Sequence, residues 1–520
     1  AWGVHNDDGL NTLNSANGNV TITSIGVSGD VRGMVSSGGG KNTVEAANGE
    51  VKISAIGGAF GRGIDAWGGD NIITAASVSI TNLNSRDAVG VAASSNGRNQ
   101  IDSSGNITIT AGRPEAIDNA ATAHDWASGL WAYTGGVNQL RADGAIDITA
   151  QYGRNTNALR NEGGANELTA DSVALKAVGG TEHTYGMYAD NGGNTVSANQ
   201  VSVTADSGTG VVAMQALNGG VNLIQGLGEG VTVVIKGTGM DNAIAMWADG
   251  NGSVNHIKGN LGAAHSDSIS IEGSIYATNG GRNLIETGGG DDTISLKGYV
   301  QSGSLNILAG DGHDTLILHA ASVSEFNQFY KGWLESYTGG TGGMSIEEVR
   351  IELSAGEGGN LGDLSQLTWL GSHFADSNLI ISGSAGDDFV SLNVSDFSDI
   401  TFHGNGGSDA MTIRFDDGGG DAATFGQFMG KSQISGLNSL VLDLTEGDHN
   451  LSLDGLFDKL DGATENLFIK GDAGDSINLG LDSGTWDTAG TEMHDGVEYH
   501  AYTNQELDMT IYVQTSMGIL

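Results

Sequence analysis

The sequence predicts an all-β chain whose larger part is a right-handed parallel β-helix, and three observations support this. A repeat of about 28 residues runs through the first half of the chain, an Asn closes a corner in each repeat, and apolar and polar residues alternate between corners. The repeat is most regular from Asn138 to Asn222, where 166 − 138, 194 − 166 and 222 − 194 are all 28. Such a period is typical of a solenoid, in which each coil buries its apolar face on the next coil.

The corner asparagines share one sequence feature, a Leu, Ile or Val two residues later. Asn suits a corner because it tolerates the left-handed backbone region and because its amide can bond to the same amide in the next coil. We therefore expect a ladder of Asn side chains along the solenoid. The predicted members are Asn11, Asn42, Asn71, Asn99, Asn138, Asn166, Asn194, Asn222, Asn255, Asn283 and Asn306.

Residues 184–207 show how one coil is expected to fold. They give a strand over 186–190, a Gly-Gly corner closed by Asn194, a second strand over 195–198 and a third over 201–205. Successive side chains of a strand point to opposite sides. The inward side chains are then Val196, Ala198, Val201, Val203 and Ala205. These small residues predict a narrow rod, in which about eleven coils spaced about 4.8 Å apart span about 50 Å.

Composition and charge narrow the function. The 520 residues include 86 Gly, one Pro and no Cys, so we expect a thin core without disulfides. The net charge of −41 argues against nucleic acid and anionic membrane surfaces, which need a basic footprint, and favours divalent cations. There is no run of 18 apolar residues, so we expect no transmembrane segment. Because Ala1 lies inside a repeat, with no Met or signal peptide, we expect a processed product or a fragment.

Changes along the chain predict four parts. Residues 1–285 form the parallel β-helix, 286–343 carry Gly-Asp turns and a helical patch, 344–480 hold two related β-rich units, and 481–520 form a C-terminal segment. One Asn spacing stretches to 138 − 99 = 39 and contains the only proline, which predicts a loop over 112–128. Three helical patches are expected to pack as core in the C-terminal part. Their apolar residues are Phe326, Phe329, Tyr330, Trp333 and Leu334, then Phe425, Phe428 and Met429, then Leu456, Phe457 and Leu460.

An aromatic side chain recurs beside an inward residue on the first strand of many coils. Alternation puts Tyr188 with Asp190, and Trp247 with Asp249, on the outward face. Stacked coils would align these rings into a stripe, which either shields the sheet or binds a glycan or another partner. The predicted stripe consists of Trp67, Trp131, Tyr133, Tyr188, Trp247 and Tyr276.

From residue 286 onward, acidic Gly-Asp turns replace the Asn corners. Segments 288–296, 309–318, 383–392 and 404–413 approximate the pattern G-G-x-G-x-D-x-U-x, in which U is apolar, and 471–479 is one residue short of it. Glycines allow a tight turn that offers carbonyls, and an Asp carboxylate supplies the hard oxygen ligand that Ca²⁺ prefers. We therefore predict Ca²⁺ as a cofactor. Its predicted ligands are Asp291, Asp292, Asp311, Asp314, Asp387, Asp388, Asp409, Asp472 and Asp475.

These turns resemble those of the repeats-in-toxin (RTX) family of secreted Ca²⁺-binding proteins, although the copies are degenerate and form no long tandem array. Roughly the last 200 residues resemble the ends of large RTX-type adhesins, with two related units at 345–392 and 436–479 before a closing segment that begins at Trp486. The resemblance implies an uncleaved C-terminal signal for type I export and folding outside the cell. It also implies a bacterial protein that is secreted or attached to the cell surface.

The predicted function is therefore structural: an extracellular, Ca²⁺-stabilised β-solenoid that serves in adhesion, a surface layer or a biofilm matrix. The alternative is a polysaccharide-active β-helix enzyme, a lyase, hydrolase or epimerase, that acts on an acidic glycan. Against an enzyme, the 21 Lys and Arg are scattered, the 12 His show no ligand spacing, and no catalytic motif is present. In its favour, Asp65, Asp190 and Asp249 fall near the aromatic stripe. An ice-binding face is disfavoured because Thr is irregularly placed.

The first coil has no cap ahead of it in the sequence. An open strand edge is a template for another chain, and a head-to-tail contact that does not close gives a filament. We therefore expect self-association with Ca²⁺ bridging the acidic faces, unless the natural first coil lies on missing sequence.

Overall fold

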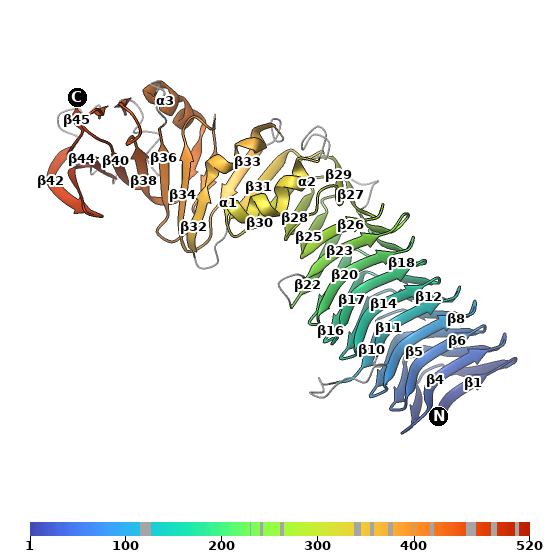
Figure 1. Cartoon of the computed structure of the whole chain (residues 1–520). Helices are drawn as coiled ribbons and strands as arrows, with labels where there is room; N and C mark the ends of the chain where they lie inside the picture. Colours follow the sequence, from blue (N-terminus) through green and yellow to red (C-terminus); the bar gives the residue numbers. More distant parts are fainter. Residues whose placement is uncertain are drawn as a thin grey trace. The chain divides into compact units, whose positions relative to one another are not determined.

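The computed structural model describes most of the chain. The described residues are 1–114, 126–228, 230–239, 243–259, 265–336, 345–353, 358–372, 378–397, 399–415, 421–453, 464–479, 486–504 and 509–520. They fall into two compact units, of which the first contains Ala1–Asp314 and the second contains Thr315 and nearly all later residues. Figure 1 shows strands in both units, and all of the described helices belong to the second.

The fold is a parallel β-solenoid of about 14 turns spaced about 29 residues apart, which confirms the predicted class. In the first unit, one wall of the solenoid is a parallel ten-stranded sheet, here called sheet A, that takes one strand from each coil. Its strands are β1 (Trp2–Asn6), β4 (Asp30–Ser37), β6 (Phe60–Trp67), β8 (Asp87–Ser94), β11 (Trp126–Tyr133), β14 (Asn155–Glu162), β17 (His183–Asp190), β20 (Gly210–Leu217), β23 (Ile244–Asp249) and β26 (Ser274–Thr278).

The other two walls of the first unit belong to a second parallel sheet, and β5 (Lys41–Ile56) and β7 (Asp70–Leu83) run through both of them. One wall continues with β2 (Leu10–Asn14), β9 (Arg98–Ser103), β12 (Val137–Ala142), β15 (Ala165–Thr169), β18 (Gly193–Ser197), β21 (Val221–Gln225), β24 (Val254–Lys258), β27 (Arg282–Gly289) and β29 (Leu305–Asp311). The other continues with β3 (Val20–Ile25), β10 (Ile107–Gly112), β13 (Ala145–Gln151), β16 (Ser172–Val178), β19 (Gln200–Asp206), β22 (Thr232–Thr238), β25 (Ser268–Glu272) and β28 (Thr293–Lys297).

The predicted alternation is correct in the coil over 184–207. The five residues expected to face inward are all buried, with at most 3% of any of them exposed. Neighbouring coils align with the predicted offset of 28 residues, so that Asn166 pairs with Asn194 and Asn194 with Asn222.

The predicted asparagine ladder is present from Asn11 to Asn283. Each Nδ2 donates to the Oδ1 of the Asn one coil further on, at 2.8–3.0 Å. The prediction for Asn306 was wrong. After Asn283 the coil shortens to 305 − 283 = 22 residues, so Leu305 takes the ladder position and Asn306 is exposed. Asn283 Nδ2 donates instead to the carbonyl of Ser304, at 2.9 Å.

The interior of the first unit is so narrow that one inward position of sheet A holds only Gly or Ala. A Cβ on Gly129 would lie 2.2 Å from Ile148 Cγ2 on the facing wall and 2.6 Å from the Ala158 carbonyl oxygen. The same clash with a facing Ile recurs at Gly90, at 2.3 Å from Ile109 Cγ2. Three coils hold a buried Ala at this position instead of Gly: Ala158, Ala213 and Ala245. Small residues facing branched ones therefore set the distance between the walls.

The second unit is also built mainly of parallel strands. One sheet contains β30 (Thr315–Ala320), β31 (Glu348–Leu353), β33 (Asn378–Ser382), β35 (Thr401–His403) and β37 (Gln433–Ser435). A second contains β32 (Gly358–Asp363), β34 (Asp387–Asn393), β36 (Ala410–Arg414), β38 (Leu437–Asp443), β40 (Thr464–Lys470) and β44 (Met509–Gln514), followed by the antiparallel β43 (Val497–Asn504) and β42 (Asp487–His494). A small third sheet contains β39 (Asn450–Ser452), β41 (Ser476–Asn478) and β45 (Gly518–Ile519).

Two of the three predicted helical patches are helical, and all of their predicted core residues are buried except Phe329, which is half-buried. The first comprises α1 (Val323–Phe326), a π-helical turn η1 (Asn327–Lys331) and α2 (Gly332–Leu334), and it buries Phe326, Tyr330, Trp333 and Leu334. The second is α3 (Asp421–Lys431), which buries Phe425, Phe428 and Met429. A 3₁₀ helix, η3 (Leu364–Ser372), was not predicted. The patch at Leu456, Phe457 and Leu460 lies outside the described residues. None of the described helices is long and apolar enough to cross a membrane.

Candidate functional site

The outward face of sheet A brings four of the six predicted stripe residues into one line. Starting at Trp131 on β11, the strand register places Arg160, Tyr188 and Gln215 opposite one another on β14, β17 and β20. The register then continues through Trp247 on β23 and Tyr276 on β26. These six residues are here called the aromatic line: Trp131, Arg160, Tyr188, Gln215, Trp247 and Tyr276.

The other two predicted stripe residues, Trp67 and Tyr133, lie beside the line. Tyr133 is two residues after Trp131 on β11, and the two rings stack with centroids 4.5 Å apart. Trp67 ends β6, is 57% exposed, and donates from its indole Nε1 to Ser95 Oγ at 3.0 Å.

The carboxylates predicted beside the line are present. The hydroxyl of Tyr188 lies 3.5 Å from Asp190 Oδ2. Burial, helped by the negative charge of Asp190, raises the pKa of Tyr188 to about 12. The phenol therefore stays protonated and can donate a hydrogen bond throughout the neutral range.

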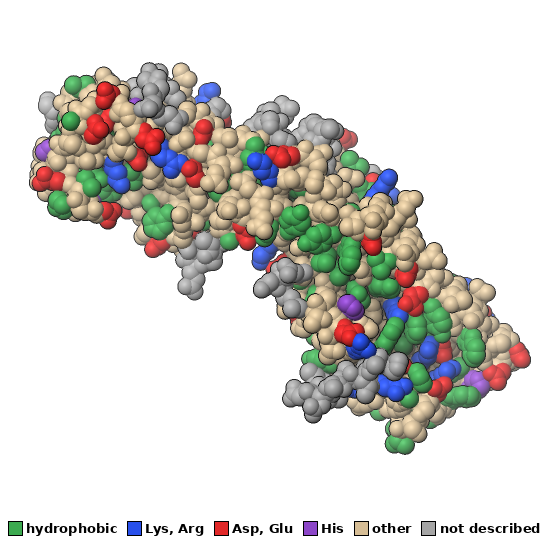
Figure 2. Space-filling model, viewed as in Figure 1, with side chains coloured by type: hydrophobic (Ala, Val, Ile, Leu, Met, Phe, Trp, Pro, Cys, Tyr) green, Lys and Arg blue, Asp and Glu red, His purple; other side chains and the backbone are tan. Residues whose placement is uncertain are grey.

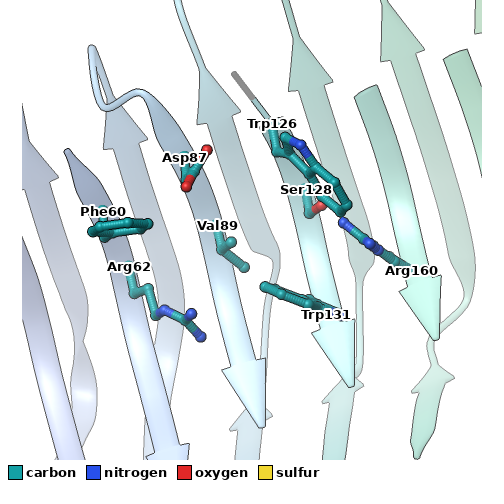
Figure 3. A pocket seen from close by; sticks show the side chains of 8 residues that line it. All are labelled: Phe60, Arg62, Asp87, Val89, Trp126, Ser128, Trp131 and Arg160. Atoms are coloured by element: carbon teal, nitrogen blue, oxygen red, sulfur yellow. The ribbon is translucent and has the colours of Figure 1, made fainter. Parts of the chain in front are cut away.

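At the β11 end of the line, the sheet carries a pocket with a volume of about 270 Å³. Figure 3 shows its side chains around Val89, with those of β6 on one side and those of β11 and β14 on the other. Its walls are mainly apolar, with three aromatic rings, and its polar groups include two guanidinium groups. The lining residues are Phe60, Arg62, Asp87, Val89, Trp126, Ser128, Trp131 and Arg160.

Arg160 lies among aromatic rings at the edge of this pocket. Its Cζ is 3.7 Å from the ring centroid of Trp126 and 4.7 Å from that of Trp131, so the cation rests on two indoles. Its Nη2 and Nε contact Glu162 Oε1 at 2.7 and 3.3 Å. Glu162 also accepts a hydrogen bond from the Trp131 indole at 3.2 Å. Burial lowers the pKa of Arg160, and the charge of Glu162 offsets this only in part.

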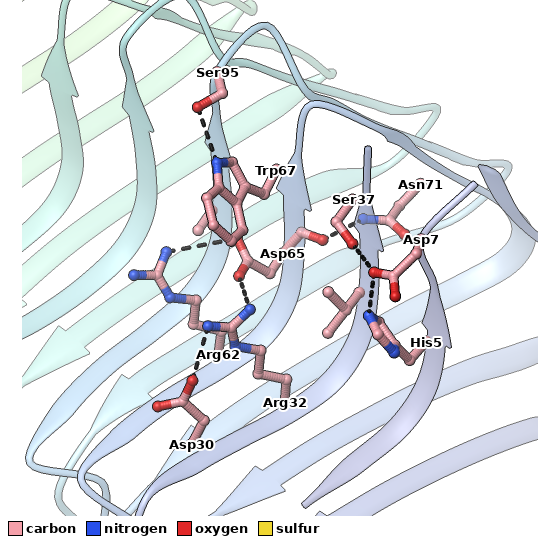
Figure 4. A network of polar contacts seen from close by, with 12 residues as sticks. His5, Asp7, Asp30, Arg32, Ser37, Arg62, Asp65, Trp67, Asn71 and Ser95 are labelled. Carbon is pink, nitrogen blue, oxygen red and sulfur yellow. Dashed lines mark hydrogen bonds and ion pairs between the residues drawn. The ribbon is translucent and has the colours of Figure 1, made fainter. Parts of the chain in front are cut away.

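Arg62 enters the pocket from a charged network on β4 and β6 (Figure 4). The carboxylate of Asp65 is 3% exposed and lies 3.0 Å from Arg32 and 3.5 Å from Arg62. Arg32 also contacts Asp30 at 3.0 Å. Burial alone would lower the pKa of Arg62, but Asp65 and then Tyr133 raise it above its ordinary value. The network therefore holds Arg62 charged and in place.

Sequence reasoning missed most of this pocket. Arg160 could have been found, because adding 28 to its number gives Tyr188, a predicted stripe residue. Trp126 and Ser128 were assigned to the loop over 112–128, and this was wrong, because β11 begins at Trp126. The remainder of that predicted loop from 115 to 125 lies outside the described residues.

The predicted Ca²⁺ ligands of the first unit bond to backbone groups of neighbouring coils. Oδ1 of Asp292 accepts a hydrogen bond from the Asp267 N–H at 2.7 Å, and Oδ1 of Asp314 accepts from the Asp292 N–H at 2.9 Å. Oδ1 of Asp291 accepts from the His313 N–H at 2.9 Å. The fourth, Asp311, is exposed and ends β29. These carboxylates connect turns in the way the asparagines connect earlier corners.

The second unit repeats this arrangement. Oδ1 of Asp409 accepts from the Asp388 N–H at 2.9 Å, and Oδ1 of Asp387 accepts from the Ser408 N–H at 2.7 Å. Oδ1 of Asp475 accepts from the His449 N–H at 2.8 Å, and its Oδ2 accepts from the Asp472 N–H of the same turn at 2.6 Å.

Within the described residues, no three Asp, Glu, His or Cys side chains come together as a set of metal ligands. Ca²⁺ binding at these turns stays a prediction.

Burial raises the pKa of Asp292 and of Asp409. Hydrogen bonds from the Thr287 side chain to Asp292 and from the Gly406 backbone to Asp409 offset this rise only in part. Burial therefore makes both carboxyl groups easier to protonate than usual.

The fold and the face of sheet A together define a β-solenoid with a row of aromatic rings and an aromatic–arginine pocket on one wall. No protein-family model, curated protein or solved structure matches the chain. Its function is therefore inferred from its own residues.

Proposed function

We propose that this protein is an extracellular, adhesive β-solenoid that binds carbohydrate on the outward face of sheet A. The observation that carries the proposal is the aromatic line, in which Trp131, Tyr188, Trp247 and Tyr276 hold one register position across six parallel strands. Export by a type I system and stabilisation by Ca²⁺ belong to the same proposal and rest on the sequence resemblance.

The line suits a long ligand with repeating apolar faces. Strands in a sheet are about 4.8 Å apart, so Trp131, Tyr188 and Trp247, on every second strand, recur about every 10 Å, and Tyr276 lies on the strand next to Trp247. The apolar C–H face of a sugar packs against such a ring, and the polar groups beside it fix the orientation of the sugar. Figure 2 shows hydrophobic side chains gathered on this face of the first unit, with acidic and basic side chains among them.

The rings of the aromatic line either shield the sheet or bind carbohydrate. A double variant distinguishes these two roles. If the rings bind sugar, Tyr188→Ala with Trp247→Ala should weaken binding about 30-fold, taking about 1 kcal/mol for each ring. Affinity electrophoresis through gels that contain single polysaccharides measures the loss, and far-UV circular dichroism should be unchanged. The matched control is Trp67→Ala, because Trp67 is exposed and lies outside the line.

Loss of the fold in the double variant would mean that the rings are packing residues. Retained binding with an intact fold would contradict the proposal. The same samples test the enzyme alternative. A lyase or hydrolase would shorten the polysaccharide during incubation, an epimerase would change its uronic-acid composition by NMR, and an adhesive protein changes neither.

A further inference from the structure

The aromatic–arginine pocket contains polar atoms that the fold leaves without partners. Arg160 is 7% exposed, and its Nη1 is buried with no hydrogen-bond partner among the described residues. Ser128 is 1% exposed, and its Oγ is likewise buried and unpaired there. Buried polar groups in native proteins nearly always have a partner, so both atoms point to a partner that the described residues do not supply.

The adjacent space is large enough for that missing partner. At about 270 Å³, the cavity is far larger than one water requires and is close to the lower end of small-ligand pockets. Its apolar lining, from Phe60, Val89, Trp126 and Trp131, suits the C–H face of a ring, while the unpaired groups stand on β11 and β14.

Two guanidinium groups, of Arg62 and Arg160, and one carboxylate, of Asp87, line the pocket, so its cations outnumber its anions and favour a negative acceptor. Glu162 engages Nε and Nη2 of Arg160 and leaves Nη1 for another acceptor. Because burial lowers the pKa of Arg160 despite Glu162, the guanidinium charge is incompletely balanced where it lies. An anionic oxygen would balance it and would also make a strong charge-assisted hydrogen bond.

We infer that this pocket binds the anionic group, a carboxylate or a sulfate, of an acidic sugar residue, with Arg160 Nη1 and Ser128 Oγ as its hydrogen-bond partners. This rests on the proposed function and adds the class of sugar to it. The chain's net charge of −41 opposes the long-range attraction of an acidic polymer, but at physiological salt charges further away than about 8 Å are largely screened, so the groups of the pocket decide binding.

Four polymers in 150 mM salt test the inference. Polygalacturonate carries carboxylates, dextran sulfate carries sulfates, and fully methyl-esterified polygalacturonate and dextran are their uncharged counterparts. We expect the wild-type chain to bind at least one of the charged polymers and to prefer it over its uncharged counterpart. The polymer that binds identifies the anionic group.

Two variants and one control link the preference to the pocket. Arg160→Gln should weaken binding of the charged polymer by about 10- to 100-fold, as expected for loss of a hydrogen bond to a charged group. Arg160→Lys should recover part of it, because it restores the charge but not the planar fork. Arg154→Gln is the matched control, since Arg154 pairs with Glu182 and lies outside the pocket. If Arg160→Gln does not fold, Ser128→Ala decides, with an expected loss of several-fold.

The outcomes separate this inference from the proposal beneath it. Equal binding of charged and uncharged polymers, unaffected by Arg160→Gln or Ser128→Ala, overturns the anionic site but leaves carbohydrate binding on the aromatic line in place. Binding of none of the four polymers overturns the anionic site, while the Tyr188 and Trp247 double variant still tests the line against other polysaccharides.

Discussion

Asn194 and Asn222 hold the same position in adjacent coils, and Nδ2 of Asn194 donates a 2.8 Å hydrogen bond to Oδ1 of Asn222. The same Nδ2 donates to the carbonyl of Tyr188 at 2.9 Å. One buried amide thus joins two coils and also satisfies the backbone of an aromatic-line residue.

Removing this amide should destabilise the first unit. In Asn194→Ala, the Tyr188 carbonyl loses its side-chain donor and Nδ2 of Asn166 loses its acceptor, and each unsatisfied buried group costs about 1–3 kcal/mol. We expect a clearly lower melting temperature by calorimetry. Asn306→Ala is the matched control, because Asn306 is exposed and off the ladder, and it should change stability by less than about 0.5 kcal/mol. Equal melting of the two variants would contradict a stabilising ladder.

Gly129→Ala should also destabilise the first unit, because the new Cβ would lie 2.2 Å from Ile148 Cγ2 and 2.6 Å from a backbone carbonyl. Overpacking of this kind costs about 1–3 kcal/mol. The contrasting variant is Gly430→Ala on α3, where a Cβ meets nothing within 4 Å and helix propensity should add up to about 1 kcal/mol. Chemical denaturation measures both, and a neutral Gly129→Ala would mean that the walls can separate.

The raised pKa of Asp409 predicts a specific pH dependence. Burial is its main cause, and the charges of Asp388 and Asp387 add to it. The folded state then binds the proton more tightly than the unfolded state, so this group makes stability fall as the pH rises from its ordinary value through its raised one. As the pH is lowered from 7 to 4 with chelator present, the free energy of unfolding of the wild type should therefore increase relative to that of Asp409→Asn. The control is Asp399→Asn, because Asp399 is exposed. The prediction is contradicted if the difference in unfolding free energy does not change with pH, or if it changes as much for Asp399→Asn.

If Ca²⁺ binds the Gly-Asp turns, it should stabilise the second unit at neutral pH, where the carboxylates are charged. Binding to the folded state alone adds RT ln(1 + [L]/Kd), about 2.7 kcal/mol at a hundredfold excess over Kd. We therefore expect the second unit to melt higher in millimolar Ca²⁺ than in chelator, with a smaller gain in Asp387→Asn. Identical melting curves in Ca²⁺ and chelator would show that the backbone bonds of these carboxylates are their whole role.

The solenoid could be predicted because its rule is local and repeated. An Asn corner and strict alternation define each coil up to Asn283, and the rule failed at Asn306, where the coil shortens from about 28 residues to 22. A shift of one residue moves a side chain to the opposite face of a strand, so a correct motif in the wrong register predicts the wrong environment.

The candidate site could be predicted only in part. The alternation of side chains along a strand was enough to predict that Tyr188 and Trp247 point outward, and the structure agrees. The pocket depends instead on how long side chains from four strands meet, with Arg160 resting on Trp126 across a strand boundary. The spacing of the repeats identifies the strands but not the side-chain conformations. In addition, the start of β11 could not be predicted, because it falls in the one coil that is 39 residues long.

The ladder also gives the solenoid a direction, because the amides from Asn11 to Asn255 each donate to the next coil and those from Asn42 to Asn283 each accept from the previous one. Each coil therefore has one donating and one accepting face, and any two coils of equal length are interchangeable. Removal of residues 167–194 would bring Asn166 next to Asn222 with the spacing kept at 28, and would shorten the aromatic line by one strand. The length of the binding face can thus change by whole coils through duplication or deletion, with no new interface to be invented.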